Sequence, residues 1–418
     1  MAKKQKKIDK EYLWHPFTQM KSWLEDDQLV IERGDGVYLY DTRGKKYLDG
    51  ISSLWVTVHG HRHKTLNQAI KKQLDKVAHS TLLGLANVPS LELAKELVEI
   101  TPKGLDKVFY SDNGSTAVEI ALKIAFQYQQ QIGQKKKKKF LTLKNAYHGD
   151  TIGSVSVGGI DLFHKIYKPL LFKAYKAKPD LFEVEKIMKA HHQEIAAMIV
   201  EPLIQAAAGM LLQPKGFLKG VRKLCNKYNI LLICDEVATG FGRTGKMFAC
   251  EHAKISPDIM CLAKGITGGY LPIAATLTTK KIFNAFLAGP KEVKTFFHGH
   301  TYTGNPLGCA AALANLEIFK NEQTIKKLQP KISFLKNQLR SLAALPQVKE
   351  VRQLGFMVGI ELNSSYQKSG HQVILEARKR GAILRPLGNV IVLMPPLSIS
   401  QRKLSDLLDI TRASITEF

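Results

Sequence analysis

The stretch Leu231-Leu232-Ile233-Cys234-Asp235-Glu236-Val237 decides the fold. A short apolar run that ends in two carboxylates predicts a buried strand with acidic groups at its carboxyl end. A buried carboxylate is costly in free energy unless it meets a cation. Further along the chain a second apolar run, residues 259–262, is followed at once by Ala263-Lys264-Gly265. Because ligands bind at the carboxyl ends of parallel strands, the two runs predict a site that holds Asp235 and Lys264.

The pairing of Asp235 with Lys264 indicates the chemistry of this site. A protonated pyridine nitrogen would satisfy the Asp235 carboxylate and become a better electron sink. A lysine just past a buried strand is partly desolvated, which lowers its pKa and makes the amine nucleophilic. Alone, Lys264 could be one more surface lysine, and Asp235-Glu236 could be part of a metal site in a nucleotide-binding protein. No G-x-x-x-x-G-K-[ST] motif lies upstream, which argues against that nucleotide site.

The middle of the chain alternates helical and strand patterns, which predicts an α/β fold with a mostly parallel sheet. Residues 115–131 have the apolar spacing of an amphipathic helix. Short apolar runs predict buried strands at 140–143, 196–200, 230–234 and 259–262. After about residue 325 a long polar helix precedes predicted strands at 359–362 and 390–394. We therefore expect a large domain over 61–325 and a smaller α+β domain built from both termini, residues 1–60 and 326–418.

Two polar motifs flank the predicted helix 115–131 and the strand 140–143. Ser111-Asp112-Asn113-Gly114-Ser115-Thr116 precedes the helix, and its backbone N–H groups and hydroxyls would suit a phosphate. The same residues fit an ordinary helix cap equally well. Asn145-Ala146-Tyr147-His148-Gly149-Asp150 follows the strand, where the Tyr147 ring could stack on a flat cofactor, although one tyrosine is weak evidence.

Composition fits a globular protein, with 45% hydrophobic and 23% charged residues. The five cysteines are odd in number and form no C-x-x-C motif, which favours a reducing environment over disulfides or a zinc site. No apolar run is long enough to cross a bilayer, and no apolar leader follows the basic residues 1–10, so we expect a cytoplasmic protein. The spacing of His59, His61 and His63 resembles that of a metal cluster, but we expect no metal there or at the His298-Gly299-His300 turn.

The net charge of +25 raises the alternative of an anionic partner such as nucleic acid. The excess is concentrated in part in Lys3, Lys4, Lys6, Lys7 and the run 135–139. Neither tract has interleaved aromatic or arginine side chains, so we interpret them as solvated tail and loop and expect no nucleic-acid partner. Steeply salt-dependent binding to DNA or RNA would support the alternative.

Six motifs are more specific together than any one alone. They are Ser-Asp-Asn-Gly-Ser-Thr-Ala-Val-Glu from Ser111, Tyr-His-Gly-Asp-Thr from Tyr147, Glu201-Pro202 with Gln205, Asp-Glu-Val-Ala-Thr-Gly-Phe-Gly-Arg-Thr-Gly from Asp235, Ala263-Lys264-Gly265, and Thr301 with Gly304-Asn305-Pro306. Their order and spacing resemble the class III (fold type I) aminotransferases over nearly the whole chain. The resemblance implies an enzyme that depends on pyridoxal 5'-phosphate (PLP), acts on small molecules, and forms a homodimer with its active sites at the subunit interface.

The resemblance also implies roles for individual residues. Lys264 would hold PLP as a Schiff base and move the substrate α-proton, and Asp235 would pair with the pyridine nitrogen. Tyr147 would stack on the ring, and with Lys264 and Asp235 it completes the implied catalytic set. The other implied cofactor contacts are Val237 on the opposite ring face, Gln205 near the 3-oxygen, Gly114 and Ser115 at the phosphate, and Thr301 from the neighbouring subunit.

Four further stretches narrow the resemblance. They are Trp-His-Pro-Phe-Thr-Gln-Met at 14–20, Asp-Gly-Ile-Ser-Ser-Leu-Trp at 49–55, Arg243 with its neighbours, and Leu-Arg-Pro-Leu-Gly-Asn at 384–389. They resemble the branch of the family that converts 8-amino-7-oxononanoate to 7,8-diaminononanoate in biotin biosynthesis. Arg385 can bind the carboxylate of this long-chain substrate bidentately. The other implied substrate contacts are Phe17, Leu54, Trp55, Tyr147, Arg243 and Gly299.

The chain departs from this branch beside the substrate. Phe17 replaces a tyrosine of many members, Leu54 replaces a second tryptophan, and His300 and Tyr302 replace proline and phenylalanine. Aromatic pairs favour a bulky cation such as S-adenosylmethionine, the usual amino donor, so the losses leave lysine as an equal alternative. A sister transaminase for ornithine, γ-aminobutyrate or a β-amino acid would share the cofactor site and differ at Phe17, Trp55 and Arg385.

Overall fold

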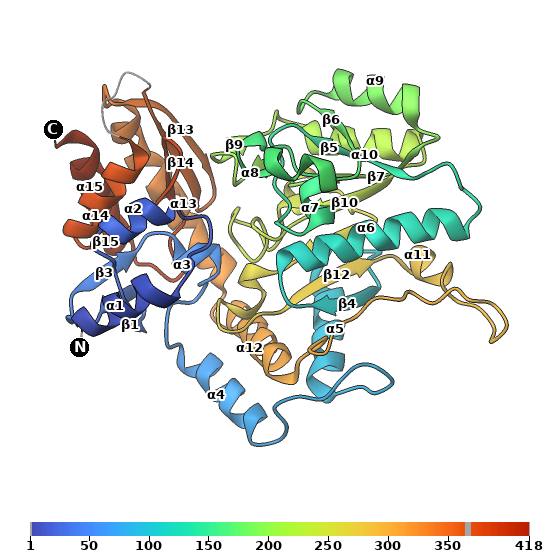
Figure 1. Ribbon diagram of the computed structural model, residues 1–418, viewed down its shortest axis with the longest axis horizontal. Helices are drawn as coiled ribbons and strands as arrows, with labels where there is room; N and C mark the ends of the chain where they lie inside the picture. Colours follow the sequence, from blue (N-terminus) through green and yellow to red (C-terminus); the bar gives the residue numbers. More distant parts are fainter. Residues whose placement is uncertain (1, 364–368, 418) are drawn as a thin grey trace.

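The structure, a computed structural model, describes residues 2–363 and 369–417. Its centre is a seven-stranded sheet in the order β4-β12-β11-β10-β7-β5-β6 (Figure 1). These strands are β4 (Lys107–Ser111), β12 (Ala274–Thr278), β11 (Ile259–Leu262), β10 (Leu231–Asp235), β7 (Ile195–Val200), β5 (Lys139–Leu143) and β6 (Tyr175–Ala177). Neighbours from β11 to β6 are parallel, whereas β12 is antiparallel to β11 and β4. The expected α/β fold with a mostly parallel sheet is confirmed.

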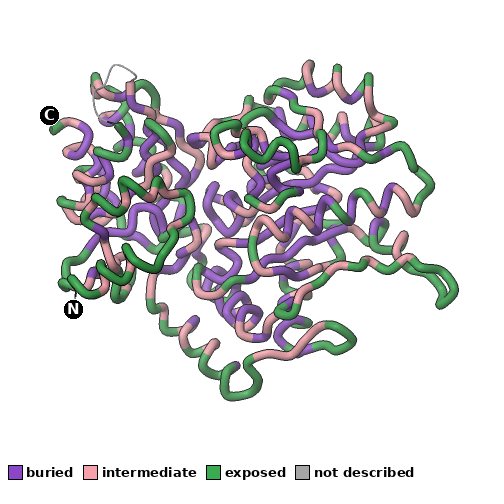
Figure 2. Tube along the Cα trace, viewed as in Figure 1, coloured by how far each residue is buried: buried purple, intermediate pink, exposed green. Residues whose placement is uncertain are grey.

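Helices bury this sheet. Helix α6 (Gly114–Gln131) packs across β11, β12 and β7, while α9 (Leu181–His191) and α10 (Phe217–Lys227) pack on each other and on β6 and β10. Every residue of β7 and β10 is buried, as expected for parallel strands with both faces covered (Figure 2). On the other side of β4, α5 (Val88–Ile100) and α12 (Pro306–Asn321) pack together, and α4 (Lys64–Leu74) lies on α12.

Both chain termini lie in a second lobe (Figure 1). One of its sheets has the order β1-β2-β3-β15, and the other is antiparallel in the order β13-β14-β17-β16. The strands are β1 (Ile31–Asp35), β2 (Tyr38–Asp41), β3 (Lys46–Asp49), β13 (Val348–Leu354), β14 (Met357–Leu362), β15 (Ala382–Ile383), β16 (Arg385–Leu387) and β17 (Val390–Leu393). Helices α13 (Thr324–Ala343), α14 (Gly370–Lys379) and α15 (Gln401–Thr416) pack around them.

The remaining elements are short or peripheral. They are α1 (Ala2–Tyr12), α2 (Met20–Glu25), α3 (Ser52–Trp55), α7 (Ile152–Ser156), α8 (Asp161–His164), α11 (Lys280–Asn284), β8 (Ile204–Gln205), β9 (Leu211–Leu212), and the 3-10 helices η1 (Lys165–Leu170), η2 (Ala249–Ala253) and η3 (Lys264–Thr267). No helix within residues 2–363 or 369–417 has both the length and the apolar character needed to cross a membrane. All five cysteines are buried and unpaired.

The elements that the sequence predicts lie where they were expected. The helix predicted at 115–131 is α6, and the strands predicted at 140–143, 196–200, 230–234 and 259–262 are β5, β7, β10 and β11 within one residue at each end. The long polar helix is α13, and the late strands are β14 and β17. The domain boundaries at 60/61 and 325/326 stay a prediction.

The lysine tracts are less solvated than the sequence indicates. Residues 2–12 form helix α1 rather than a loose tail. Lys6 of this helix forms an ion pair with Asp27, which lies in the segment after α2. Within the run 135–139, Lys137 is buried and its Nζ donates to the carbonyls of Ile195 (3.2 Å) and Asn229 (2.7 Å). Burial lowers the pKa of Lys137 to about 8. The interpretation of this run as a solvated loop is therefore wrong at its middle residue.

Candidate active site

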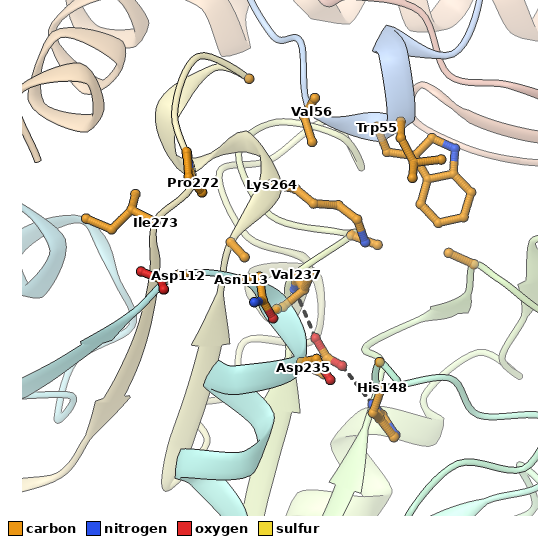
Figure 3. Close-up of a pocket in the computed structure, with 18 of the residues that line it drawn as sticks. Trp55, Val56, Asp112, Asn113, His148, Asp235, Val237, Lys264, Pro272 and Ile273 are labelled. Carbon is orange, nitrogen blue, oxygen red and sulfur yellow. Dashed lines mark hydrogen bonds and ion pairs between the residues drawn. The ribbon is translucent and has the colours of Figure 1, made fainter. Parts of the chain in front are cut away.

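A cavity of about 500 Å³ opens at the carboxyl ends of β10 and β11 (Figure 3). Its walls come from segments far apart in the sequence, namely residues 54–56, 112–115, 147–150 and parts of 235–238 and 263–273. This is the edge at which ligands bind in open α/β sheets. Of the residues with an implied cofactor or substrate role, the ones that line the cavity are Leu54, Trp55, Gly114, Ser115, Tyr147, Asp235, Val237 and Lys264.

Asp235 and Lys264 are brought together by the parallel pairing of β10 with β11. Asp235 is the last residue of β10 and lies opposite Cys261, which is one residue before the end of β11 and three residues before Lys264. Burial lowers the pKa of Lys264, against the opposing effect of the Asp235 and Glu201 carboxyls. The Lys264 ammonium also lies 5.1 Å from the centre of the Trp55 ring. The juxtaposition predicted from the two apolar runs is confirmed.

Lys264 has an unusual backbone conformation. Its φ is 47°, in the left-handed region that residues with a Cβ adopt at a cost. The turn that follows is the 3-10 helix η3, which ends at Gly268 with a φ of 64°. Together they direct the Lys264 side chain into the cavity rather than along the sheet (Figure 3).

A buried network surrounds Asp235, and it includes His148 and Glu201, to which the sequence interpretation assigned no role. His148 Nδ1 lies 2.7 Å from Asp235 Oδ2, and the Val237 N–H donates to Asp235 Oδ1 at 3.1 Å (Figure 3). Glu201 is also buried, and it accepts hydrogen bonds from the backbone N–H groups of Tyr147 (3.2 Å) and Ala206 (3.0 Å). Burial raises the pKa of Glu201 to about 7, with His148 lowering it and Asp235 raising it. His148 and Glu201 both stand in motifs quoted above, but no local pattern predicts a contact between strands.

The amino end of helix α6 forms one wall. Asn113 caps the helix, and the backbone N–H groups of Gly114 and Ser115 occupy its first two positions, where no intrahelical acceptor exists. A Cβ at Gly114 would lie 2.5 Å from Val237 Cγ1, so only glycine allows this close approach. Ser115 Oγ accepts from the backbone N–H groups of Asp150 and Thr151, both at 3.0 Å. The motif is therefore a helix cap that also forms a wall of the cavity, and its role in binding a phosphate stays a prediction.

Tyr147 lies in the cavity wall with its hydroxyl engaged. The hydroxyl donates to Asp150 Oδ2 at 2.6 Å. Burial, and then this hydrogen bond to Asp150, raise the pKa of Tyr147. The Phe163 ring lies edge-on to Tyr147 at 6.2 Å, and Phe17 lies edge-on to Phe163 at 5.4 Å. Phe17 is therefore one ring removed from Tyr147 and is largely exposed.

The other residues with implied roles lie outside the cavity wall. Gln205 is buried and donates to the Lys144 carbonyl at 2.8 Å. Arg243 is fully buried and donates to the carbonyls of Pro395 (2.7 Å) and Thr57 (3.2 Å). Burial lowers the pKa of Arg243 to about 10. Gly299 and Thr301 are exposed on the segment before α12 and do not line the cavity of their own chain.

Arg385 stands at the start of β16 and is half-buried. Burial lowers its pKa, and an opposing electrostatic effect of Tyr147 raises it. In the part of the chain that the structure describes, the Arg385 side chain has no hydrogen-bonding or ion-pairing partner. A half-buried cation without a partner is a candidate receptor for an anionic ligand.

The residues present fit PLP. Asp235 offers a buried carboxylate for a cationic ring nitrogen, and Lys264 offers an amine with a lowered pKa. The free N–H groups of Gly114 and Ser115, at the start of an 18-residue helix, suit a phosphate group. Two of the histidines at 59, 61 and 63 have acidic partners: His61 pairs with Asp49 (2.9 Å) and His63 with Glu322 (3.5 Å). Across the residues that are described, no cluster of three or more His, Cys, Asp or Glu side chains could hold a metal ion.

The fold and the cavity are those of a PLP-dependent aminotransferase. The sequence model of the family described as "Aminotransferase class-III" matches residues 21–415, and the chain belongs to this family, with PLP as its cofactor. The adenosylmethionine-8-amino-7-oxononanoate aminotransferase of Aquifex aeolicus is 55% identical over 98% of this chain and 97% of its own.

Solved structures agree with this assignment. The crystal structure of adenosylmethionine-8-amino-7-oxononanoate aminotransferase from Methanocaldococcus jannaschii matches with a TM-score of 0.98 and 50% identity, over 100% of this chain and 99% of its own. A PLP-bound amine transaminase from an uncultivated Pseudomonas species matches with a TM-score of 0.92 and 35% identity, over 97% of this chain and 99% of its own.

Proposed function

We propose that this enzyme transfers an amino group to 8-amino-7-oxononanoate, giving 7,8-diaminononanoate for biotin biosynthesis, with S-adenosylmethionine as the donor. Relatives whose names contain adenosylmethionine and 8-amino-7-oxononanoate match nearly the full chain, at up to 55% identity. The observation in this chain that carries the proposal is Arg385, a half-buried cation whose side chain lacks a partner in the described part of the protein. It can bind the carboxylate at the far end of the keto acid.

The residues of the cavity suggest how the reaction proceeds. PLP, when bound, supplies an electron sink that makes the α-proton of an amine removable. We expect Lys264 to accept that proton at Nζ and to return it, because its lowered pKa favours the neutral amine. Asp235 would keep a ring nitrogen protonated, and His148 holds the carboxylate at 2.7 Å. Tyr147 and Val237 would cover the two ring faces.

The remaining implied contacts are also part of the proposal. Gly114 and Ser115 would bind the phosphate, and Gln205 would reach the 3-oxygen region. Leu54, Trp55 and Phe17 would line the path of the alkyl chain. Arg243, whose guanidinium binds two backbone carbonyls, would act by holding the segments of Thr57 and Pro395 in place.

We further propose a cytoplasmic homodimer. Gly299 and Thr301 are exposed and do not line the cavity of their own chain, and Thr301 would complete the phosphate site of the other subunit. Light scattering of the purified enzyme should give twice the mass of 46.7 kDa. Fractionation of the producing cells should place it with the cytoplasmic proteins.

A half-reaction experiment tests the substrates. The PLP-loaded enzyme is mixed separately with 7,8-diaminononanoate, S-adenosylmethionine and lysine, and loss of the cofactor absorbance is followed. We expect the first two compounds to bleach the band and lysine to leave it unchanged. Bleaching by lysine but not by S-adenosylmethionine would replace the donor. If 7,8-diaminononanoate has no effect but ornithine, γ-aminobutyrate or a β-amino acid does, the enzyme is a sister transaminase.

A further inference from the structure

The segment before the Thr301 loop lies along helix α6. We name residues 294–301 the strap. Residues 294–300 are all described by the structure, and none of them belongs to a helix or strand. In Figure 1 it runs from the loop after α11 toward the start of α12, beside α6 and in the opposite direction. A segment with no hydrogen-bond ladder of its own needs other partners to fix its path.

Three side chains of α6 supply those partners. Lys123, Gln127 and Gln131, which we name the α6 ladder, lie four residues apart and so share one face of the helix. Gln131 Nε2 donates to the Lys294 carbonyl at 3.1 Å, and Gln127 Nε2 donates to the Thr295 carbonyl at 3.0 Å. Both glutamines of the α6 ladder therefore bind the strap through its backbone carbonyls. These contacts do not depend on which side chains the strap carries.

The last member of the ladder holds the strap near its functional end. Lys123 Nζ lies 3.4 Å from the Phe297 carbonyl oxygen and 2.9 Å from His298 Nδ1. Burial and Lys123 both lower the pKa of His298, so its ring is neutral and can accept this hydrogen bond. Beyond it, His300 Nδ1 lies 3.4 Å from Asp112 Oδ2, and Asp112 lines the cavity.

Packing supports the same path. The Phe296 ring is edge-on to Phe109 of β4 at 5.3 Å and to Phe286 at 6.0 Å, so it turns inward. Phe297 is 74% exposed and turns outward, next to the exposed Gly299 and Thr301. The strap thus has one face fixed on its own subunit and one face open.

We propose that Lys123, Gln127 and Gln131 are positioning residues that set the path of the strap, so that helix α6 directs two phosphate contacts at once. Its amino end presents Gly114 and Ser115 to the cofactor of its own subunit, and its outer face aims Thr301 at the cofactor of the other subunit. This inference rests on the proposed homodimer. It adds three residues that do not line the cavity of their own chain to those that determine PLP affinity.

The first test is the affinity for PLP. In the double variant Gln127→Met/Gln131→Met the side chains keep their length and helix propensity but lose both donors. We expect the Kd for PLP to rise about 10-fold in this double variant, because the strap loses two neutral hydrogen bonds of ordinary strength. The matched control is Gln130→Met, which removes a donor to the Lys137 carbonyl (3.1 Å) on another side of the same helix. The inference is overturned if the double variant and the control have the same Kd.

The second test shows in which subunit the strap acts. Dimers are assembled from two differently tagged chains, with Lys264→Ala used to leave one working site. When the strap variant and Lys264→Ala are on different chains, the working site receives an intact Thr301, and we expect the PLP concentration for half-maximal activity to match the parent. When both changes are on one chain, we expect the PLP concentration for half-maximal activity to rise by about the same factor as the Kd for PLP in the first test.

The two tests separate this inference from the proposed homodimer. If only the dimer with the two changes on different chains is impaired, the strap acts within its own subunit and the positioning role is wrong, while the homodimer stands. If light scattering shows a monomer that binds PLP and turns over, the homodimer and the positioning role both fail.

Discussion

At the scale of single residues, turnover depends on Lys264. We expect Lys264→Ala to lose transamination completely, since the group that accepts the α-proton is gone, while the fold persists because little packing is lost. The measurements are the rate of 7,8-diaminononanoate formation and a thermal melt followed by circular dichroism. Lys254→Ala is a matched control, because Lys254 is exposed and its φ of 53° imposes the same backbone cost. Residual turnover by the Lys264 variant would contradict the assigned role.

Glu201 makes stability depend on pH. Its pKa is raised from 4.5 to about 7 in the folded protein, so between these values the folded state binds more protons than the unfolded state. Stability therefore decreases as the pH rises from about 4.5 to 7, by about 3 kcal/mol in total. Glu201→Gln should remove this decrease. We measure the melting temperatures of variant and parent at pH 5 and at pH 8. Relative to the parent, the variant should be more stable at pH 8 than at pH 5. An equal difference in melting temperature at the two pH values would contradict this role of Glu201.

At the scale of secondary-structure elements, one lysine ties together the starts of two central strands. Lys137 donates to the carbonyls of Ile195, at the start of β7, and Asn229, just before β10. Lys137→Gln should destabilise the protein by about 2–4 kcal/mol, since charge-assisted hydrogen bonds between buried groups are lost. Lys136→Gln, one residue earlier and exposed, should have no measurable effect on the free energy of unfolding in urea. Similar effects of the two substitutions would show that the buried contacts do not matter.

The same run of lysines shows what the sequence could and could not predict about elements. The helix α6 and the strands β5, β7, β10 and β11 follow from apolar spacing, which is a local property. The burial of Lys137 depends on carbonyls 58 and 92 residues away in the chain, which no local pattern encodes. The helix α1 was missed because lysines mask its periodicity. Its fixation by the Lys6–Asp27 pair is again a distant contact.

At the scale of the whole molecule, the cavity combines distant segments. Trp55, Tyr147, Asp235 and Lys264 were predicted to share a site, and they do line one cavity. The motifs predicted their chemical types, but the His148–Asp235 contact and the path of the strap required the assembled fold.

Arg385 tests how the second lobe contributes to the site. Arg385→Ala should raise the KM for 8-amino-7-oxononanoate by about 10- to 100-fold, because one or two charge-assisted hydrogen bonds are lost. The Kd for PLP should change little. Arg385→Lys should recover part of the affinity, because the charge remains but the bidentate geometry does not. Steady-state kinetics with varied keto acid provide the measurement. An unchanged KM in the alanine variant would exclude Arg385 from carboxylate binding.

The five buried cysteines have a practical consequence for studies of this enzyme. They sit in α10, β10, η2, β11 and α12, and burial raises the pKa of Cys225 and of Cys309 to about 12. A thiol reagent can therefore modify them only when these elements open, so the labelling rate reports the free energy of opening region by region. Labelling with and without PLP would then map how far the stabilisation by the cofactor spreads from the carboxyl ends of β10 and β11, with no substitution in the chain.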